Sequence, residues 1–432
     1  WSVRRLKILH NGQTKRYSKF FKFLGPGLIT GAADDDPSGI ATYSQAGATY
    51  GFGQLWSIAL CLPLMIAVQE TCARIGSVTG KGLVKVTSEI YSKKILYAVV
   101  SLVVIANIIN IGADIAAVGA ALNLLIPLSV FTLSSIFTLV VLLLEILVGY
   151  HAYAKFLKFL ALSLLAYVAT AFIVGPDWGE VFRSLVIPKI TWEANYWYVL
   201  VALLGTTISP YMFFWQATEE VEEQKYAIKA GIPKRSLKVI RRDNTLGMTI
   251  SQIGSLFMII TTAVVLHNNG VTEIGTAADA AKALEPLVSG FPDAGLYAKI
   301  LFTLGIIGMG LLGIPVLAGS VSYAISDTRN WPQGLDFKFA QAKQFYVVII
   351  FATGAGWIMN AIGIDPMKAL VFAAVINGLV SIPLIFLISR ISKNSKVMGI
   401  HTGGPLSRTM LMFTFFVTLA AGLILGISLI GG

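Results

Sequence analysis

Three adjacent aspartates, Asp34, Asp35 and Asp36, lie in an otherwise apolar stretch and are followed directly by Pro37. Carboxylates are tolerated within a membrane-spanning segment only where they face the protein interior or a water-filled cavity. Proline has no backbone N–H to donate, so Pro37 predicts a break in the helix at the same place. A broken helix exposes main-chain carbonyls, and beside a carboxylate these are oxygen ligands for a hard cation. The stretch therefore predicts a cation site at a broken transmembrane helix.

The three aspartates are not expected to be equivalent. Asp36 is the first candidate for a metal ligand, because the residue before a proline is biased out of the helical region and towards the break. Its alternative role is that of a capped or protonated carboxylate at a helix break. Asp34 and Asp35 turn to other faces if the helix continues to them, since successive residues are rotated by about 100°. They either set the electrostatic potential of the vestibule or are held in structural hydrogen bonds, and both roles stay open.

A second break is predicted near the middle of the sequence, where Gly205, Thr206, Thr207, Ser209 and Pro210 interrupt another apolar segment. The hydroxyl and main-chain oxygens of Thr206 and Ser209 could bind the same cation. Serine and threonine hydroxyls also often bond back to a carbonyl of their own helix, and the sequence does not decide between the two roles.

Other polar side chains lie within apolar segments. Asn107, Asn110 and Asp114 are spaced i, i+3 and i+7, which places them on one face of a helix. They line an aqueous path, or they form buried hydrogen bonds that only support helix packing. Glu145 lies near the end of the next segment, where we expect it to snorkel to the membrane interface.

The composition identifies the class of protein to which these residues belong. The chain has 432 residues, of which 56% are hydrophobic and 13% charged, and its mean hydropathy is +0.75. These values indicate an all-α polytopic membrane protein. Eleven apolar segments are long enough to span a bilayer, at residues 23–50, 54–73, 95–122, 127–148, 152–175, 195–218, 245–266, 296–324, 344–364, 368–389 and 409–430.

The net charge of +11 does not indicate a nucleic-acid partner, because the basic residues alternate between successive loops. All but five of the 33 Lys and Arg residues lie on one side of the predicted membrane. By the positive-inside rule that side is cytoplasmic. We therefore expect a protein of the plasma (inner) membrane with a cytoplasmic N-terminus, an external C-terminus and the lipid bilayer as its surroundings.

The two breaks lie in the first and sixth spans, five spans apart, so the two halves of the chain enter the membrane in opposite directions. Interrupted helices at corresponding positions of two inverted halves are typical of secondary transporters. We expect a basic tail at 1–22, a first inverted repeat at 23–194, a second at 195–390, and a loop with one additional helix at 391–432.

Several short motifs resemble the Nramp family of divalent metal transporters. They are Phe23-Leu24-Gly25-Pro26-Gly27, Asp36-Pro37-Ser38-Gly39, Tyr50-Gly51-Phe52-Gly53, Ala73-Arg74-Ile75-Gly76 with Thr79-Gly80-Lys81, and Gly112-Ala113-Asp114. The resemblance covers essentially the whole chain. It implies an eleven-helix, amino-acid-transporter-like fold with inverted five-helix repeats and broken helices 1 and 6, and transport of a divalent metal ion.

The metal-binding motifs depart from those of the manganese and iron transporters of this family, which usually carry Asp-Pro-Gly-Asn in helix 1 and Met-Pro-His in helix 6. Here Asp36 is kept, but Gly39, Ser209 and Tyr211 occupy the asparagine, methionine and histidine positions. A thioether favours transition metals, so its loss removes a filter against magnesium. Gly39 and Ser209 are also expected to leave more room for a partly hydrated ion. The pattern resembles the Nramp-related magnesium transporters.

The resemblance also bears on proton coupling. Coupled members have a glutamate three residues after the helix 3 aspartate and a histidine in helix 6, and here Ala117 and Tyr211 stand at those positions. Tyrosine, whose pKa is about 10, is a poor proton carrier at neutral pH. We therefore expect uncoupled uptake of magnesium, and also of manganese, driven by the ion gradient and a membrane potential worth about 2.3 kcal/mol per charge per 100 mV.

The metal site is thus expected at Asp36, Gly39, Thr206 and Ser209, and the permeation path at Asn107, Asn110, Asp114 and Tyr211. The nearest alternative is a proton-coupled manganese or iron transporter, and a further one is a non-transporting sensor on the same fold. An enzyme is not expected, because no nucleophile with a base and no His or Cys cluster is visible. No cofactor and no obligate protein partner are expected.

Overall fold

The computed structural model describes residues 26–148, 165–229, 231, 235–335 and 337–431. Within these ranges the chain is helical and contains no β-strand. The α-helices are α2 (Pro26–Asp34), α3 (Pro37–Tyr50), α4 (Leu55–Thr79), α5 (Leu83–Ile90), α6 (Lys93–Asn123), α7 (Val130–Leu147), α9 (Leu165–Val174), α10 (Trp178–Val186), α11 (Ala194–Thr207), α12 (Pro210–Lys229), α13 (Leu237–Val265), α14 (Ala277–Lys282), α15 (Ala294–Arg329), α16 (Lys343–Met359), α17 (Pro366–Lys393), α18 (Ser395–Met398) and α19 (Pro405–Gly431).

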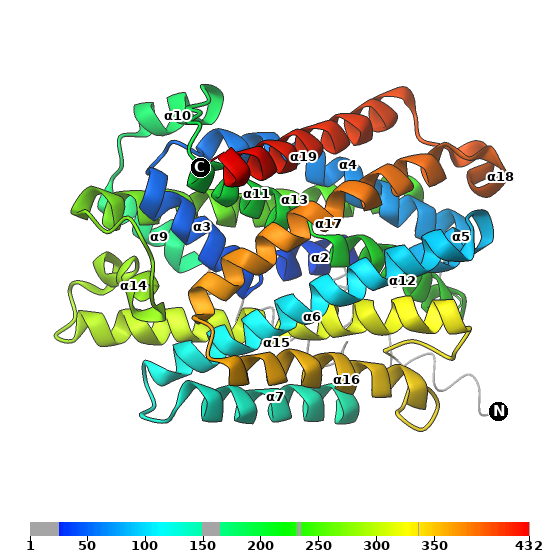
Figure 1. The fold of residues 1–432 in the computed structure, drawn as a ribbon, viewed down its shortest axis with the longest axis horizontal. Coiled ribbons are helices and arrows are strands. Elements are labelled where there is room, and N and C mark those ends of the chain that lie inside the picture. The colour runs from blue at the N-terminus through cyan, green and yellow to red at the C-terminus, as the bar shows by residue number, and fades with distance from the viewer. Residues whose placement is uncertain (1–25, 149–164, 230, 232–234, 336, 432) are drawn as a thin grey trace, which may run out of the picture.

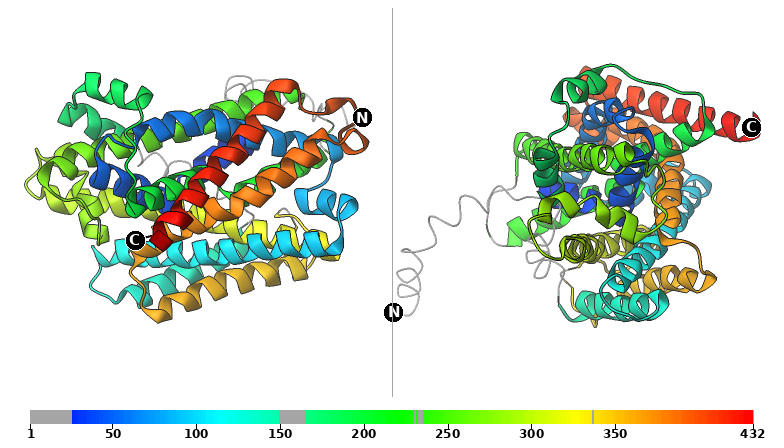
Figure 2. Two further views of the ribbon diagram at one scale, coloured as in Figure 1. Left: turned by 45° about the horizontal axis from the view of Figure 1, so that its top comes forward. Right: turned by 90° about the vertical axis from the view of Figure 1, so that its left-hand side faces the viewer.

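The long helices run together as one bundle, with α5 and α18 at one end and α10, α14 and the last turns of α19 at the other (Figure 1). We call these the α5 end and the α14 end. α6, α7, α15 and α16 pack against one another on one side. α2 and α3 lie inside the bundle, whereas α19 runs along its outside (Figure 2).

The described residues include nine helical segments that are long and apolar enough to cross a membrane. The first predicted span is not among them, because it is divided into the shorter helices α2 and α3. The predicted fifth span, 152–175, lies largely outside the described residues, and α9 covers its last part. The basic tail at 1–22 and the motif residues 23–25 also lie outside them. The bounds of the repeats stay a prediction.

Both predicted breaks are present. α2 ends at Asp34 and α3 begins at Pro37, with Asp36 as its N-cap. α11 ends at Thr207 and α12 begins at Pro210. In each case the proline is the first residue of the second half-helix, where its missing N–H costs no intrahelical hydrogen bond.

The first broken helix lies along α13 at very short distance, and glycines make this possible. A Cβ added at Gly31 would be 2.4 Å from the main chain of Gly247, and one added at Gly47 would be 2.5 Å from the carbonyl oxygen of Ile259. Any side chain at either position would collide with backbone that cannot move aside. α13 therefore supports both halves of the broken helix.

Two sequence-based expectations are wrong, one about a loop and one about a side chain. The segment 219–244, which separates two predicted spans, is not a loop throughout, because α12 continues to Lys229 and α13 begins at Leu237. Its polar residues are partly buried against neighbouring helices, as Gln224 is by hydrogen bonds to Ser77. Glu145 does not snorkel to the interface, because it lies on the buried stripe of α7 and is only 3% exposed.

Candidate metal site

Asp36 lies at the centre of a buried polar cluster at the first helix break. Its Oδ1 accepts hydrogen bonds from the Ser38 hydroxyl (2.6 Å) and the Gly39 amide (2.9 Å). Its Oδ2 accepts from Asn110 Nδ2 (3.0 Å) and the Tyr211 hydroxyl (3.0 Å). The first two bonds cap α3, and the last two join the break to α6 and α12.

Asn110 connects Asp36 to two further residues. Its Nδ2 also lies 3.4 Å from Oδ2 of Asp114, and its Oδ1 accepts a hydrogen bond of 3.2 Å from Nδ2 of Asn377 on α17. Asp36, Asn110, Asp114, Tyr211 and Asn377 are each 0% exposed. We call these five residues the Asp36 cluster. Asn377 was not predicted, although an asparagine within the apolar sequence of α17 was a signal for it.

Asn107, which shares a helix face with Asn110 and Asp114, is not part of this cluster. Its Nδ2 donates to the main-chain oxygen of Leu317 on α15 at 3.2 Å. The face predicted for α6 is therefore divided between two neighbours, with Asn110 directed at the helix break and Asn107 at α15.

Gly39 and Thr206 bring the two breaks together. A Cβ added at Gly39 would lie 3.3 Å from Thr206 Oγ1 and 3.3 Å from Tyr43 Cε2. The additional room expected at Gly39 is therefore filled by these neighbours in this conformation. Thr206 Oγ1 also lies 3.5 Å from the Ser38 hydroxyl, next to Asp36.

Ser209 bonds back to its own helix. Its hydroxyl lies 2.8 Å from the Gly205 carbonyl oxygen and 2.7 Å from that of Thr206. These are carbonyls at the end of α11 that the break leaves without a helical partner. A cation could use them only if the Ser209 side chain turned away.

A glycine of α15 closes the remaining side of the cluster. A Cβ added at Gly313 would lie 3.1 Å from Cβ of Asp36 and 4.0 Å from Oδ2 of Asp114. Glycines of this helix permit close packing, and Gly313 does so directly at the site. Its role could not be distinguished in the sequence from that of the other glycines in α15.

Asp34 and Asp35 face away from the Asp36 cluster and towards α13. The Ser251 hydroxyl lies 3.4 Å from Asp34 Oδ2 and 3.2 Å from Asp35 Oδ1, and the Ser255 hydroxyl lies 3.2 Å from Asp35 Oδ1. Of the two roles considered for these aspartates, these contacts with α13 correspond to structural hydrogen bonds.

The cluster is closed from both ends of the bundle. A cavity of about 520 Å³ at the α14 end reaches Gln45 of α3, nine residues or about 13 Å along the helix from Asp36. A cavity of about 430 Å³ at the α5 end reaches Thr218, seven residues or about 10 Å beyond Tyr211. Neither cavity is lined by a residue of the Asp36 cluster.

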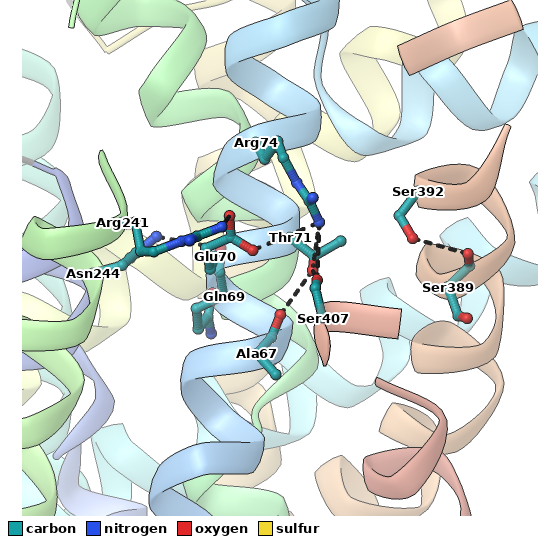
Figure 3. Close-up of polar contacts among 10 residues, drawn as sticks. All are labelled: Ala67, Gln69, Glu70, Thr71, Arg74, Arg241, Asn244, Ser389, Ser392 and Ser407. Atoms are coloured by element: carbon teal, nitrogen blue, oxygen red, sulfur yellow. Dashed lines mark hydrogen bonds and ion pairs between the residues drawn. The ribbon is translucent and has the colours of Figure 1, made fainter. Parts of the chain in front are cut away.

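Two ionic networks lie at the α5 end. In the first, Glu70 lies 3.6 Å from Arg74 and 3.3 Å from Arg241, and Arg74 donates to the Ser407 hydroxyl of α19 at 3.1 Å (Figure 3). Glu70 and Arg74 are spaced i, i+4, so they lie on one face of α4. Both side chains are buried, and Figure 3 shows Glu70 beside Arg241 of α13 and Arg74 directed at Ser407 of α19.

The second network connects one half of each broken helix, α2 and α12. Asp243 Oδ2 accepts from the Gly27 amide at the start of α2 (2.9 Å) and from Arg235 Nη2 (2.8 Å). Arg235 Nη1 also lies 3.5 Å from Glu220 Oε1 on α12. α2 and α12 are thus connected through one arginine and α13.

The donor set of the Asp36 cluster consists of carboxylate, amide and hydroxyl groups. Among the described residues, no basic side chain forms an ion pair with Asp36 or Asp114. Two buried carboxylates without a basic partner favour binding of a cation. The described residues hold no group of three or more His, Cys, Asp or Glu side chains that could bind a metal ion, so a cation at Asp36 would also need amide, hydroxyl, main-chain or water oxygens.

Curated relatives match between 69% and 96% of the chain. It is 26% identical over 429 residues to the divalent metal cation transporter MntH of Caldanaerobacter subterraneus, covering 96% of this chain and 94% of that protein. It is 30% identical over 317 residues to MntH of Yersinia pestis, covering 69% of this chain and 71% of that protein.

Solved structures with the same fold include a manganese transporter of Eremococcus coleocola, with a TM-score of 0.72 and 16% identity over 96% of this chain and 87% of that one. The transporter MhsT in complex with L-phenylalanine has a TM-score of 0.64 and 11% identity, over 93% of this chain and 98% of that one. The expected amino-acid-transporter-like fold with inverted repeats is confirmed. The family model described as natural resistance-associated macrophage protein-like matches residues 27–428, and the chain therefore belongs to the Nramp family.

Proposed function

We propose that this protein transports divalent metal ions across the membrane and that Asp36 is the central ligand. The observation that carries this proposal is the position of Asp36, a buried carboxylate at a helix break that is also bonded to α6 and α12. A site between two broken helices is where transporters of this architecture bind their substrate. Curated relatives named as divalent metal cation transporters support it.

We further propose that the preferred ion is partly hydrated magnesium, with manganese as a second substrate. The Asp36 cluster provides only oxygen and amide groups, and Ser209 stands where a thioether would select transition metals. Magnesium keeps several waters and binds through one or two carboxylates. Asp36 and Asp114, joined through Asn110, would supply these carboxylates.

Transport is proposed to be uncoupled from protons. The Tyr211 hydroxyl donates to Asp36 in place of an ionisable imidazole, and Ala117 leaves α6 without a second carboxylate one turn from Asp114. A tyrosine hydroxyl does not exchange a proton readily at neutral pH as an imidazole does, and alanine has no proton to exchange.

In the proposed cycle the site would open alternately towards the cavity at the α14 end and the cavity at the α5 end, which the Asp36 cluster separates in this structure. The α5 end would open when the Arg235 network releases α2 and α12. The basic residues of the loops support a cytoplasmic location for this end, with the C-terminus outside and the protein in the plasma membrane. No cofactor and no protein partner are needed for this cycle.

The test is a flux assay in proteoliposomes that contain a magnesium indicator, with a pH indicator in parallel samples. Uptake of Mg²⁺ without a change of internal pH is expected, and a potential that is negative inside should accelerate it. Acidification that accompanies metal uptake would instead support the second candidate, proton-coupled manganese transport. The specific observation behind that candidate is the fold similarity to a manganese transporter.

A further inference from the structure

A largely apolar cavity of about 430 Å³ lies between α6, α16 and α17. α6 packs against both other helices, and Figure 1 shows the end of α16 and the start of α17 beside it towards the α14 end. The lining includes Ile109, Ala113 and Ala116 of α6, Met359 of α16, Ile364 of the connection to α17, and Phe372 of α17. None of the lining residues belongs to the Asp36 cluster. We call this space the α17 cavity.

The surroundings of the α17 cavity are apolar. Phe372 at its edge is 47% exposed, and Ile358 in the last turn of α16 is 62% exposed. Both lie in segments long and apolar enough to cross a membrane, where large exposed apolar side chains face lipid. A lipid tail is as apolar as these side chains. An apolar cavity of even about 150 Å³ stays dry and takes up an apolar guest, so an acyl chain is the occupant that fits this space.

A positive charge lies at the mouth of the α17 cavity. Lys368 and Tyr198 line both this cavity and the polar cavity of about 520 Å³ at the α14 end, so they lie where the two spaces meet. Lysine keeps its ammonium in the polar layer while its stem covers apolar surface, and it binds phosphate as a point charge. Tyrosine is typical of the same boundary between water and hydrocarbon.

The Lys368 ammonium is available to a phosphate. It lies 3.5 Å from Glu273, but the two side chains are 67% and 71% exposed. An ion pair between exposed side chains contributes little to stability. A phosphate at the mouth of the cavity can therefore take the place of the Glu273 carboxylate.

We propose that the α17 cavity is a phospholipid site, in which one acyl chain lies between α6, α16 and α17 and Lys368 binds the phosphate of the same lipid. Binding weakens the contact between Lys368 and Glu273. The segment that carries Glu273 is also bonded to α3, where the Thr49 hydroxyl donates to the Thr272 carbonyl oxygen at 2.8 Å. The lipid thus releases one attachment of this segment at the α14 end. Its effect on opening rests on the proposed transport cycle, whereas the lipid site does not.

The experiment is photolabelling of the purified full-length protein in phosphatidylcholine nanodiscs that contain phosphatidylglycerol with a diazirine in one acyl chain. Peptide mass spectrometry locates the label, which we expect mainly at 109–116 and 359–372. Unlabelled phosphatidylglycerol should compete at least tenfold better than diacylglycerol with the same chains, which lacks the phosphate. No metal ion is present, so failure of the transport proposal would leave this result unchanged.

Two pairs of variants test the chain and the phosphate separately. Ala116→Phe fills the cavity and should reduce labelling at least tenfold, whereas Ser101→Phe places the same ring on exposed α6 surface about 22 Å away and should not. Lys368→Gln should abolish the preference for phosphatidylglycerol over diacylglycerol. Lys299→Gln removes a lysine of α15 that does not line the cavity, and it should keep this preference.

Three outcomes would overturn the phospholipid site. Labelling spread evenly over the exposed faces of α7 and α19 would identify ordinary bilayer lipid. Wild-type labelling in Ala116→Phe would show that the acyl chain lies elsewhere. An equal loss of the phosphatidylglycerol preference in Lys368→Gln and Lys299→Gln would exclude a specific role of Lys368. If Ala116→Phe does not fold, the smaller replacement Ala116→Leu decides the question of the chain.

Discussion

Replacing Asp36 by asparagine is the sharpest test of the transport site, because it removes one charge and changes no volume. Oδ1 of the new amide can still accept from Ser38 and Gly39, and asparagine is as good an N-cap as aspartate. Its Nδ2 would face the amide of Asn110 and the hydroxyl of Tyr211, which now donate to the carboxylate at 3.0 Å each. Tyr211 can reverse its hydroxyl, but Asn110 loses an acceptor, so we expect a loss of about 1–3 kcal/mol in stability.

The effect on the ion should be much larger. Removing one partner of a buried charge pair costs about 3–5 kcal/mol, which corresponds to roughly 10²- to 10⁴-fold weaker binding at about 1.36 kcal/mol per decade. Calorimetric titration with Mg²⁺ measures the affinity, and flux into proteoliposomes measures transport. Glu145→Gln is the control, because it makes the same chemical change at a buried position outside the Asp36 cluster. Magnesium flux of Asp36→Asn above one tenth of the wild type, in folded protein, would remove Asp36 from the site.

Three other changes test the surroundings of the site. Asn377→Leu removes a buried donor to α6, and we expect about 10- to 100-fold weaker Mg²⁺ binding in the same titration; wild-type affinity would show that α17 is not involved. Arg235→Gln should open the α5 end and increase hydrogen exchange at residues 26–34, whereas Arg241→Gln, whose side chain is 64% exposed, should change it little; equal exchange in both variants would argue against the network as a closure. Ser209→Met combined with Gly39→Asn should shift the Mn²⁺-to-Mg²⁺ flux ratio towards manganese about tenfold, at about 1–3 kcal/mol of stability because the space at Gly39 is filled; an unchanged ratio would place selectivity elsewhere.

The sequence was sufficient for the helix breaks and for naming four of the five residues that meet in the Asp36 cluster, whereas their roles in metal binding stay a prediction. Pro37 and Pro210 located both breaks because each stands beside glycines and polar residues as well as lacking an N–H, whereas Pro63, Pro315 and Pro383 lie within the continuous helices α4, α15 and α17. Asn110 and Asp114 could be assigned to one face by their spacing alone. Asn107 lies on the same face, but the spacing could not show that its hydrogen bond goes to α15, because the face is wide enough to meet two different neighbours.

The remaining features depend on contacts between distant segments, which a single sequence does not contain. Asn377 reaches Asn110 from 267 positions away, and its register on α17 is set by helix packing. Ser251 and Ser255 carry no local signal of the aspartates that they face. Ser209 was a reasonable ligand by its position, but its bonds to its own helix depend on the local path of the chain through the break.

The saturation of Asp36 by four hydrogen bonds has a kinetic consequence. In this closed state the carboxylate is already solvated, by protein groups in place of water. When an ion arrives, Asn110 and Tyr211 must release Oδ2 of Asp36 before this oxygen can bind the ion, so binding is an exchange of hydrogen-bond donors for a cation. A partly hydrated ion can make this exchange nearly neutral, because the hydrogens of its retained waters can replace the two donors that leave. A bare ion of the same charge would have to displace them without such compensation.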